Sequence, residues 1–155
     1  MKVIKRQREK SQKAAEYFAP TVNSFQNLWE NLPVACHILT PEGIITHVNQ
    51  TEARMLGYKK EEMVGKSIFD FVLPEQRLVA KKRFQQKLAG RRLPRARDRI
   101  YVRKDGSKLN VIINDRIKWD SQKKPICVFG TLVNITNYKK VEDLNQEMMK
   151  NMRNW

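Results

Sequence analysis

Apolar and polar residues alternate over three runs in the second half of the chain, and this pattern predicts β-strands. The runs cover residues 95–102, 109–119 and 126–136. The turn between the first two contains Asp105-Gly106, a pair that favours a hairpin. Two earlier apolar runs, at residues 34–39 and 44–49, flank a turn and predict another hairpin. The pattern therefore predicts five strands.

Helical spacing of apolar residues separates the two groups of strands. Short helices are expected after Asn49, which can cap the first of them, and over residues 59–64 and 68–73. The longest helix should run over residues 74–89, because Pro74 suits its first turn and Gly90 follows its end. Its expected inward residues are Leu78, Phe84 and Leu88. These elements predict an α+β fold: a five-stranded antiparallel sheet with short helices and one long helix on one face.

Two helical extensions flank this central part. Residues 1–19 predict a basic surface helix, and the helix after it carries Phe25, Leu28, Trp29 and Leu32 at a spacing that requires burial of one face. We expect three parts: a basic helical extension at 1–24, a domain at 25–137 and a helix at 138–155.

The last helix has apolar residues at alternating steps of three and four. The seam consists of Val141, Leu144, Met148, Asn151 and Trp155. Such a seam either folds back onto the domain or pairs with a second chain. We favour parallel pairing.

Several short motifs follow one another along the chain: Gly43 to Asn49, Leu56-Gly57-Tyr58, Glu62 to Gly65, Arg103-Lys-Asp-Gly-Ser107 and Gly130 to Thr136. Their order and spacing resemble those of the PAS family of sensory domains. The family usually has aspartate where this chain has Asn134, which can still cap a helix but leaves any salt bridge to the exit helix in doubt. The resemblance covers residues 25 to 140.

This resemblance implies a cavity under the helices that either binds a small molecule or is filled by side chains. Candidate lining residues, each equally suited to plain core packing, are Met55, Ile68, Phe71, Phe84, Leu88, Ile113 and Phe129. The resemblance also implies a homodimer and a relay from the sheet to the last helix. The candidate dimer residues are Phe25, Leu28, Val141, Leu144 and Met148, and the candidate relay residues are Asn134 and Thr136.

We therefore expect the sensor portion of a bacterial or archaeal signalling protein, such as a histidine kinase, a cyclic-dinucleotide enzyme or a transcription regulator. An output domain or a separate signalling partner would receive the signal. Two-component signalling fits this arrangement.

Charge supports an alternative function. The formal net charge is +15, and residues 1–13 and 75–124 carry the excess. A basic domain could bind nucleic acid or an acidic protein through the Arg/Lys-rich region 77–124. Nucleic acid is not expected, because Tyr101 alone offers a stacking ring amid the arginines. A solvated basic face is the commoner outcome.

Three arginines at alternate positions stand out in the first of the late strands. Arg95, Arg97 and Arg99 would share one face. Facing the cavity, they would bind a carboxylate or phosphate; facing outward, they would be solvated. Apolar Ile100 and Val102 occupy the opposite phase, which favours the outward orientation.

Cofactor chemistry finds little support in the sequence. The resemblance implies that haem would be bound by a histidine of the long helix. Haem is disfavoured, because that helix has none and His37 and His47 lie on predicted strands. The resemblance also implies that a photoactive flavin needs a cysteine on the helix before the long one, and no cysteine lies between Cys36 and Cys127, so this cofactor is also disfavoured. Non-covalent flavin stays open, with Trp119, Asn114 and Phe84 as candidates. The ligand is thus unknown: a small organic molecule or none.

Catalytic, metal and membrane roles are also not expected. Adjacent Cys36 and His37 would point to opposite faces of a strand, so no metal site is expected. The chain contains no nucleophile or nucleotide-binding motif, which predicts a non-enzyme. Its two cysteines suit a reducing compartment, and no apolar run is long enough for a membrane span. We expect a cytoplasmic protein.

Overall fold

The computed structural model describes residues 2–17, 21–91 and 98–154. These divide into two compact units, residues 1–33 and residues 34–155. The first unit consists of helices α1 (Lys2–Tyr17) and α2 (Val22–Asn31). The expected part boundary between residues 24 and 25 falls inside α2.

Helix α2 begins at a reciprocal cap formed by Thr21 and Ser24. The Thr21 hydroxyl accepts from the Ser24 backbone N–H, and the Ser24 hydroxyl accepts from the Thr21 backbone N–H. Helix α2 contains no buried residue, and Phe25 and Leu28 are 60% and 43% exposed. Its apolar side chains are thus available for contacts outside the helix.

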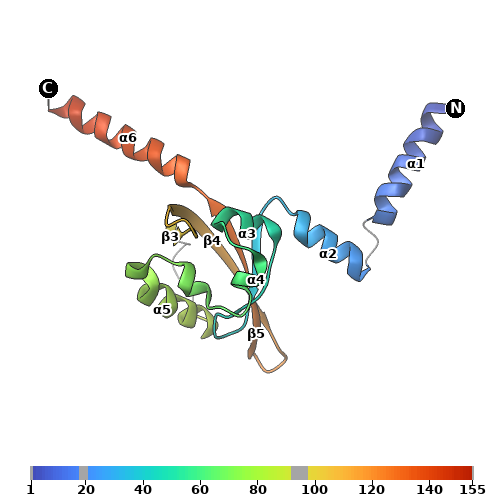
Figure 1. Ribbon diagram of the computed structural model, residues 1–155, viewed down its shortest axis with the longest axis horizontal. Helices are drawn as coiled ribbons and strands as arrows, with labels where there is room; N and C mark the ends of the chain where they lie inside the picture. Colours follow the sequence, from blue (N-terminus) through green and yellow to red (C-terminus); the bar gives the residue numbers. More distant parts are fainter. Residues whose placement is uncertain (1, 18–20, 92–97, 155) are drawn as a thin grey trace. The chain divides into compact units, whose positions relative to one another are not determined.

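The second unit is built on a five-stranded antiparallel sheet in the order β2-β1-β5-β4-β3. The strands are β1 (Ala35–Leu39), β2 (Ile45–Val48), β3 (Asp98–Val102), β4 (Lys108–Trp119) and β5 (Pro125–Asn134). Figure 1 shows them with α3, α4 and α5 on one side of the sheet. The predicted α+β fold is confirmed.

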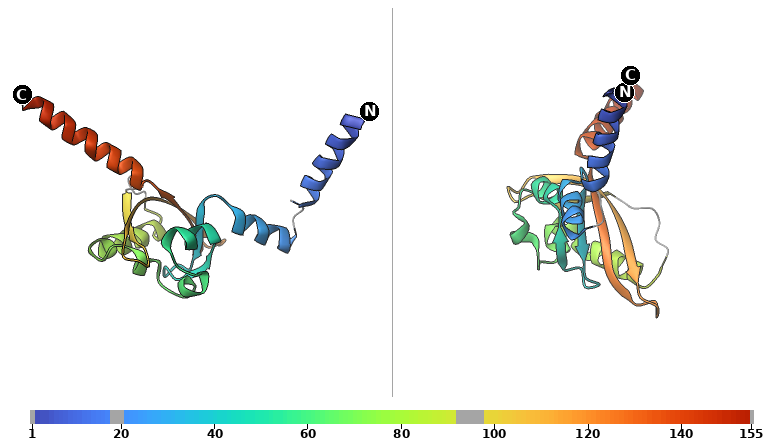
Figure 2. Two further views of the ribbon diagram at one scale, coloured as in Figure 1. Left: turned by 45° about the horizontal axis from the view of Figure 1, so that its top comes forward. Right: turned by 90° about the vertical axis from the view of Figure 1, so that its right-hand side faces the viewer.

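Short helices cover the core face of this sheet. They are α3 (Gln50–Leu56), α4 (Lys60–Met63), η1 (Ile68–Phe71), η2 (Pro74–Gln76) and α5 (Arg77–Leu88), of which η1 and η2 are 3₁₀ helices. Gly57 ends α3 at φ 76°, a left-handed conformation that glycine adopts without strain. The two turned views of Figure 2 also place these helices on one side of the strands.

Of the three residues predicted to face inward from α5, Phe84 and Leu88 do so and Leu78 does not. Ala80 and Phe84 are buried and Leu88 packs against the core, whereas Leu78 is 81% exposed. The reason is that α5 begins after the turn of η2, and its inward stripe runs through Ala80, Phe84 and Leu88, spaced by four residues. Leu78 lies off that stripe.

Helix α6 (Thr136–Arg153) follows β5 directly and contains no buried residue. Val141, Leu144 and Met148 are 56%, 59% and 61% exposed. Trp155, the last member of the predicted seam, lies outside the described residues. No helix of the described ranges is long and apolar enough to cross a membrane.

Candidate ligand site in the core

Two ionisable residues and a glycine between them form a row across the core face of the sheet. His37 on β1 pairs in register with Gly130 on β5, which pairs with Asp115 on β4. The neighbours of His37 on the same face are Ala35 and Leu39, which are 1% and 2% exposed. Ionisable side chains thus lie in the middle of an otherwise apolar core.

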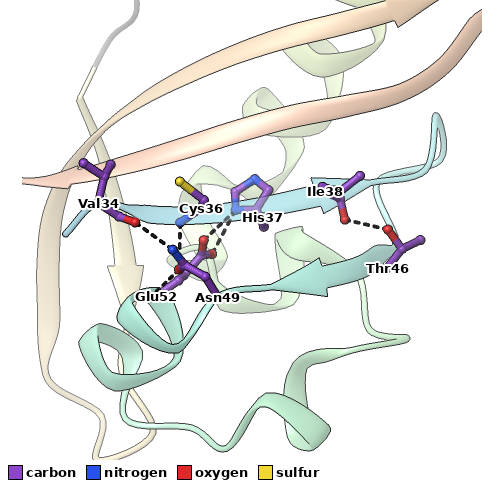
Figure 3. A network of polar contacts seen from close by, with 7 residues as sticks. All are labelled: Val34, Cys36, His37, Ile38, Thr46, Asn49 and Glu52. Carbon is purple, nitrogen blue, oxygen red and sulfur yellow. Dashed lines mark hydrogen bonds and ion pairs between the residues drawn. The ribbon is translucent and has the colours of Figure 1, made fainter. Parts of the chain in front are cut away.

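The carboxylate of Glu52, on α3, contacts the imidazole of His37. Its Nδ1 lies 2.9 Å from both carboxylate oxygens of Glu52, and both residues are almost fully buried (Figure 3). Burial of an unpaired carboxylate would be costly, so the imidazole is the group that makes Glu52 tolerable there.

Asn49 explains why Glu52 lies above His37. The Asn49 side-chain oxygen accepts from the backbone N–H groups of Glu52 and Cys36, both at 3.0 Å, and its amide nitrogen donates to the Val34 carbonyl at 2.8 Å (Figure 3). Asn49 therefore caps α3 and also ties that cap to β1. Its predicted capping role is confirmed.

The electrostatic environment shifts the pKa of several groups around this row. Burial acts to lower the pKa of His37, but the charge and hydrogen bond of Glu52, with a smaller effect of Asp115, outweigh it and raise that pKa. Burial raises the pKa of Tyr101 well above its usual value, and the charges of Glu52 and Asp115 add to this effect. The surroundings therefore favour the protonated form of His37 and the neutral form of Tyr101 more than water does.

Gly130 makes room for the His37 ring. A Cβ atom at position 130 would overlap Nε2 of His37. The imidazole therefore extends across β5 toward the β4 side of the row. No other residue type leaves this space, which explains a glycine in the middle of a strand.

Asp115 has one satisfied and one unsatisfied oxygen. Its Oδ2 accepts from Lys87 of α5 at 2.8 Å, and its side chain is 9% exposed. Its Oδ1 is buried and has no hydrogen-bond partner. An orphaned carboxylate oxygen in a core indicates a missing donor.

Arg99 on β3 is the second group with an orphaned atom. It pairs in register with fully buried Val111, so the two side chains share the core face. Its Nε is buried without a hydrogen-bond partner, and burial lowers its pKa, an effect that the charge of Asp115 partly opposes. The outward orientation predicted for Arg99 is therefore wrong. Arg95 and Arg97 lie outside the described residues.

The candidate lining residues fall into two groups. Ile68, Phe71 and Phe84 are buried in the core cluster, and Met55, Leu88 and Ile113 pack against it. Phe129 is 43% exposed, because Val128 and Gly130 take the inward positions of β5. It points to the opposite face and cannot line a core site. Asn114, considered for flavin, is exposed on the same outer face.

Sequence reasoning missed Glu52, Asp115, Lys87 and Tyr101 as site residues, and considered His37 only as a ligand of haem or of a metal ion. Asp115 carried a signal, because it occupies the apolar phase of β4 between Ile113 and Ile117. Gly130, a glycine inside a strand, was a second signal. Nothing in the sequence alone paired Glu52 with His37.

The predicted relay residues lie at the junction of the sheet with α6. Asn134 Oδ1 accepts from both the backbone N–H and the hydroxyl of Thr136, at 3.0 and 2.7 Å. The Thr136 hydroxyl in turn accepts from the Asn110 N–H of β4. An ion pair between Lys139 and Asp98 of β3, at 2.6 Å, holds the first turn of α6 to the edge of the sheet.

Comparison with known proteins identifies the fold family. The family model described as the PAS fold matches residues 23–135. The chain belongs to the PAS family. This match confirms the predicted family, whose domains are sensory modules. No curated protein matches the chain.

Solved structures support the same PAS architecture. The PAS domain of an HTR-like protein from Haloarcula marismortui is 25% identical, with a TM-score of 0.58; the match covers 84% of this chain and 99% of that one. A sensory box histidine kinase/response regulator from Burkholderia thailandensis is 17% identical, with a TM-score of 0.66 and coverage of 84% and 98%.

A LOV protein from Rhodobacter sphaeroides is 16% identical, with a TM-score of 0.62 and coverage of 80% and 68%. This likeness is one of fold alone.

In the described part of the chain, no group of three or more His, Cys, Asp or Glu side chains could hold a metal ion. Cys36 and Cys127 lie on neighbouring strands but four register positions apart, since Cys36 pairs with Thr131.

Proposed function

We propose that this PAS protein is a non-catalytic, cytoplasmic sensory module that binds a small polar molecule at the row of His37, Gly130 and Asp115. Binding would change the sheet, and α6 would pass this change to an output domain or a separate signalling partner. The module would act as a homodimer.

Three buried side-chain atoms of the described residues lack a hydrogen-bond partner: Asp115 Oδ1, Arg99 Nε and Arg103 Nε. The single observation that carries this proposal is the first two of them, since Asp115 Oδ1 lacks a donor and Arg99 Nε lacks an acceptor. Both groups face the side of the sheet that the helices cover. Each orphaned atom costs about 1–3 kcal/mol in a folded core. A bound polar molecule would supply both partners.

The connection to α6 supports an output route through that helix. Its start is bonded to β4 through Asn110, to β5 through Asn134 and to β3 through Asp98. Since Arg99 and Asp115 lie on β3 and β4, the same strands carry the orphaned atoms and the helix attachments. A ligand that binds two arrangements of these strands with different affinity would shift α6 between them.

Dimerisation would use apolar side chains that a single chain leaves in water. They are Phe25 and Leu28 on α2, and Val141, Leu144 and Met148 on α6. Leu144→Glu should dissociate the dimer, because it places a charge in the seam. Gln146→Glu, at the outermost position of the same turn, is the matched control. Light scattering coupled to size exclusion gives the mass of each variant.

Native mass spectrometry of the freshly purified protein beside a denatured sample tests the ligand. An excess mass that disappears on denaturation supports a bound molecule, and an absorption band of the same sample would identify haem or flavin instead of a colourless compound. A protein that carries no excess mass, and whose melting temperature no compound of a broad metabolite panel raises, contradicts ligand sensing.

A further inference from the structure

Arg99 is one of several half-buried arginines, Arg83 and Arg103 among them, for which the described residues provide no ion pair. Glu52 pairs with His37, and Asp115 pairs with Lys87. No carboxylate within the described ranges forms an ion pair with Arg99, which is half-buried. A half-buried guanidinium without a counter-ion is unfavourable, so the site as it stands calls for an anionic group.

A simple anion does not complete the site, because Asp115 Oδ1 requires a hydrogen-bond donor. A carboxylate has no proton to give, and it would leave that oxygen unsatisfied. The missing partner must therefore carry a negative group that accepts from Arg99 and a separate N–H or O–H that donates to Asp115.

The overall charge decides between an amine and a hydroxyl as that donor. An amino acid is neutral overall and would leave the excess positive charge of Arg99 uncompensated. A hydroxylated carboxylate carries one negative charge and neutralises it. Charge–charge interactions are strong at low effective dielectric, and Arg83 adds a further positive charge near Arg99, so the ligand with a net negative charge forms the more stable complex.

We infer, on the basis of the sensory function proposed above, that the core site of this chain selects a small hydroxycarboxylate. Its carboxylate accepts from the guanidinium of Arg99, and its hydroxyl donates to Oδ1 of Asp115. Gly130 gives the His37 ring its place on the core face, and Lys87 holds Asp115 in place through its second oxygen.

Calorimetric titration of the whole chain with four compounds of similar size tests this inference. The compounds are glycerate, propionate, glycerol and alanine. They carry respectively a carboxylate with two hydroxyls, the carboxylate alone, hydroxyls alone, and a carboxylate with an amine and no hydroxyl. Glycerate should bind at least about tenfold more tightly than each of the others, because each comparison removes one charge-assisted hydrogen bond or one charge. Equal affinities, or tighter binding of alanine, would overturn the inference.

Arg99→Gln should weaken glycerate binding by about tenfold or more and leave the weak glycerol affinity unchanged. Arg116→Gln, an exposed β4 position on the outer face, is the matched control for the loss of one positive charge. An Arg99→Gln variant that binds glycerate as well as Arg116→Gln would overturn the assignment. The four-compound comparison needs no variant, so it stands even where Arg99→Gln does not fold.

The two proposals fail in different ways. If the purified protein retains some other molecule and glycerate has no advantage, the hydroxycarboxylate assignment is wrong and ligand sensing stands. If the protein retains nothing and no compound binds, both are wrong, and ordered water is the partner of Asp115 and Arg99.

Discussion

The two faces of the β-sheet differ in an unusual way: the buried face contains ionisable side chains, and the outer face contains exposed apolar ones. The face under the helices contains His37, Asp115 and Arg99 within an apolar core. The opposite face presents Phe129 and Val133, which are 43% and 45% exposed. Sheets with one solvated face ordinarily place apolar residues inside and polar ones outside.

This difference teaches that each face is suited to a further partner. The core face holds polar groups with unused hydrogen-bonding capacity, which suits a small polar molecule. The outer face holds apolar side chains in water, which suits another protein segment. The most informative substitutions are those that affect one face and spare the other.

Removal of the imidazole should have the largest effect. His37→Leu leaves the buried Glu52 carboxylate without a partner and should lower the free energy of unfolding by about 3–5 kcal/mol. Chemical denaturation measures this change. His47→Leu, which alters the exposed histidine of neighbouring β2, is the control and should change little.

The double variant His37→Leu/Glu52→Leu sharpens the same test. It removes the stranded charge and should recover much of the lost stability, since apolar replacements of buried ion pairs are often neutral. A His37→Leu protein as stable as His47→Leu would show that the pair is not buried in solution.

A methyl group on Gly130 should have the next largest effect. Gly130→Ala places a Cβ atom against the His37 ring, which Glu52 prevents from moving aside, and should cost about 1–3 kcal/mol. Val133→Ala, on the same strand but on the outer face, should cost less than about 1 kcal/mol. Equal losses in thermal denaturation would contradict a tightly packed core row.

Stability should also depend on pH through His37. Because its pKa is raised in the folded state, the pair with Glu52 stabilises the protein fully below the unfolded histidine pKa of about 6.5. This contribution is lost as the pH rises through the higher folded pKa. Asp115 acts in the same direction, and Tyr101, whose pKa lies well above its usual value, stays neutral over that range.

Denaturation of the natural chain and of His37→Leu/Glu52→Leu between pH 5.5 and 9 measures this dependence. As the pH rises, the free energy of unfolding of the natural chain should fall relative to that of the double variant. A difference that stays constant over the range would mean that the pKa of His37 is the same in the folded and the unfolded chain.

The smallest effect is expected on the outer face. Phe129→Ser should lower the free energy of unfolding of the single chain by no more than about 1 kcal/mol, because much of the ring is already in water. Val128→Ser, the buried neighbour on the other face, should cost more. The reverse order would mean that the outer face is covered in solution.

Much of the fold could be predicted from the sequence, because its signals are local. Asn49 begins α3 as expected, Gly57 ends it, and the Asp105-Gly106 turn joins β3 to β4. These residues act on their own backbone, so no knowledge of distant segments is needed. The five strands follow from the same local patterns.

The core site could not be predicted in the same way, because it depends on which phase of each strand faces the helices. On β3, the apolar residues Ile100 and Val102 suggested that their face of the strand is the buried one. In the structure Tyr101 is buried instead, and Arg99 lies on the same face as Tyr101. The pairing of His37 with Glu52 depends on contacts between segments that sequence patterns do not specify.

The attachment of α6 to three strands has a mechanical consequence. A helix of 18 residues is about 27 Å long at 1.5 Å per residue. A rotation of about 5° at its attached end would therefore displace the far end by about 2 Å, a simple lever calculation from that length. Adjustments smaller than an atom's diameter beside Asn110 and Asp98 would thus be amplified along α6, and whatever holds its far end would receive a larger movement than the one made at the sheet.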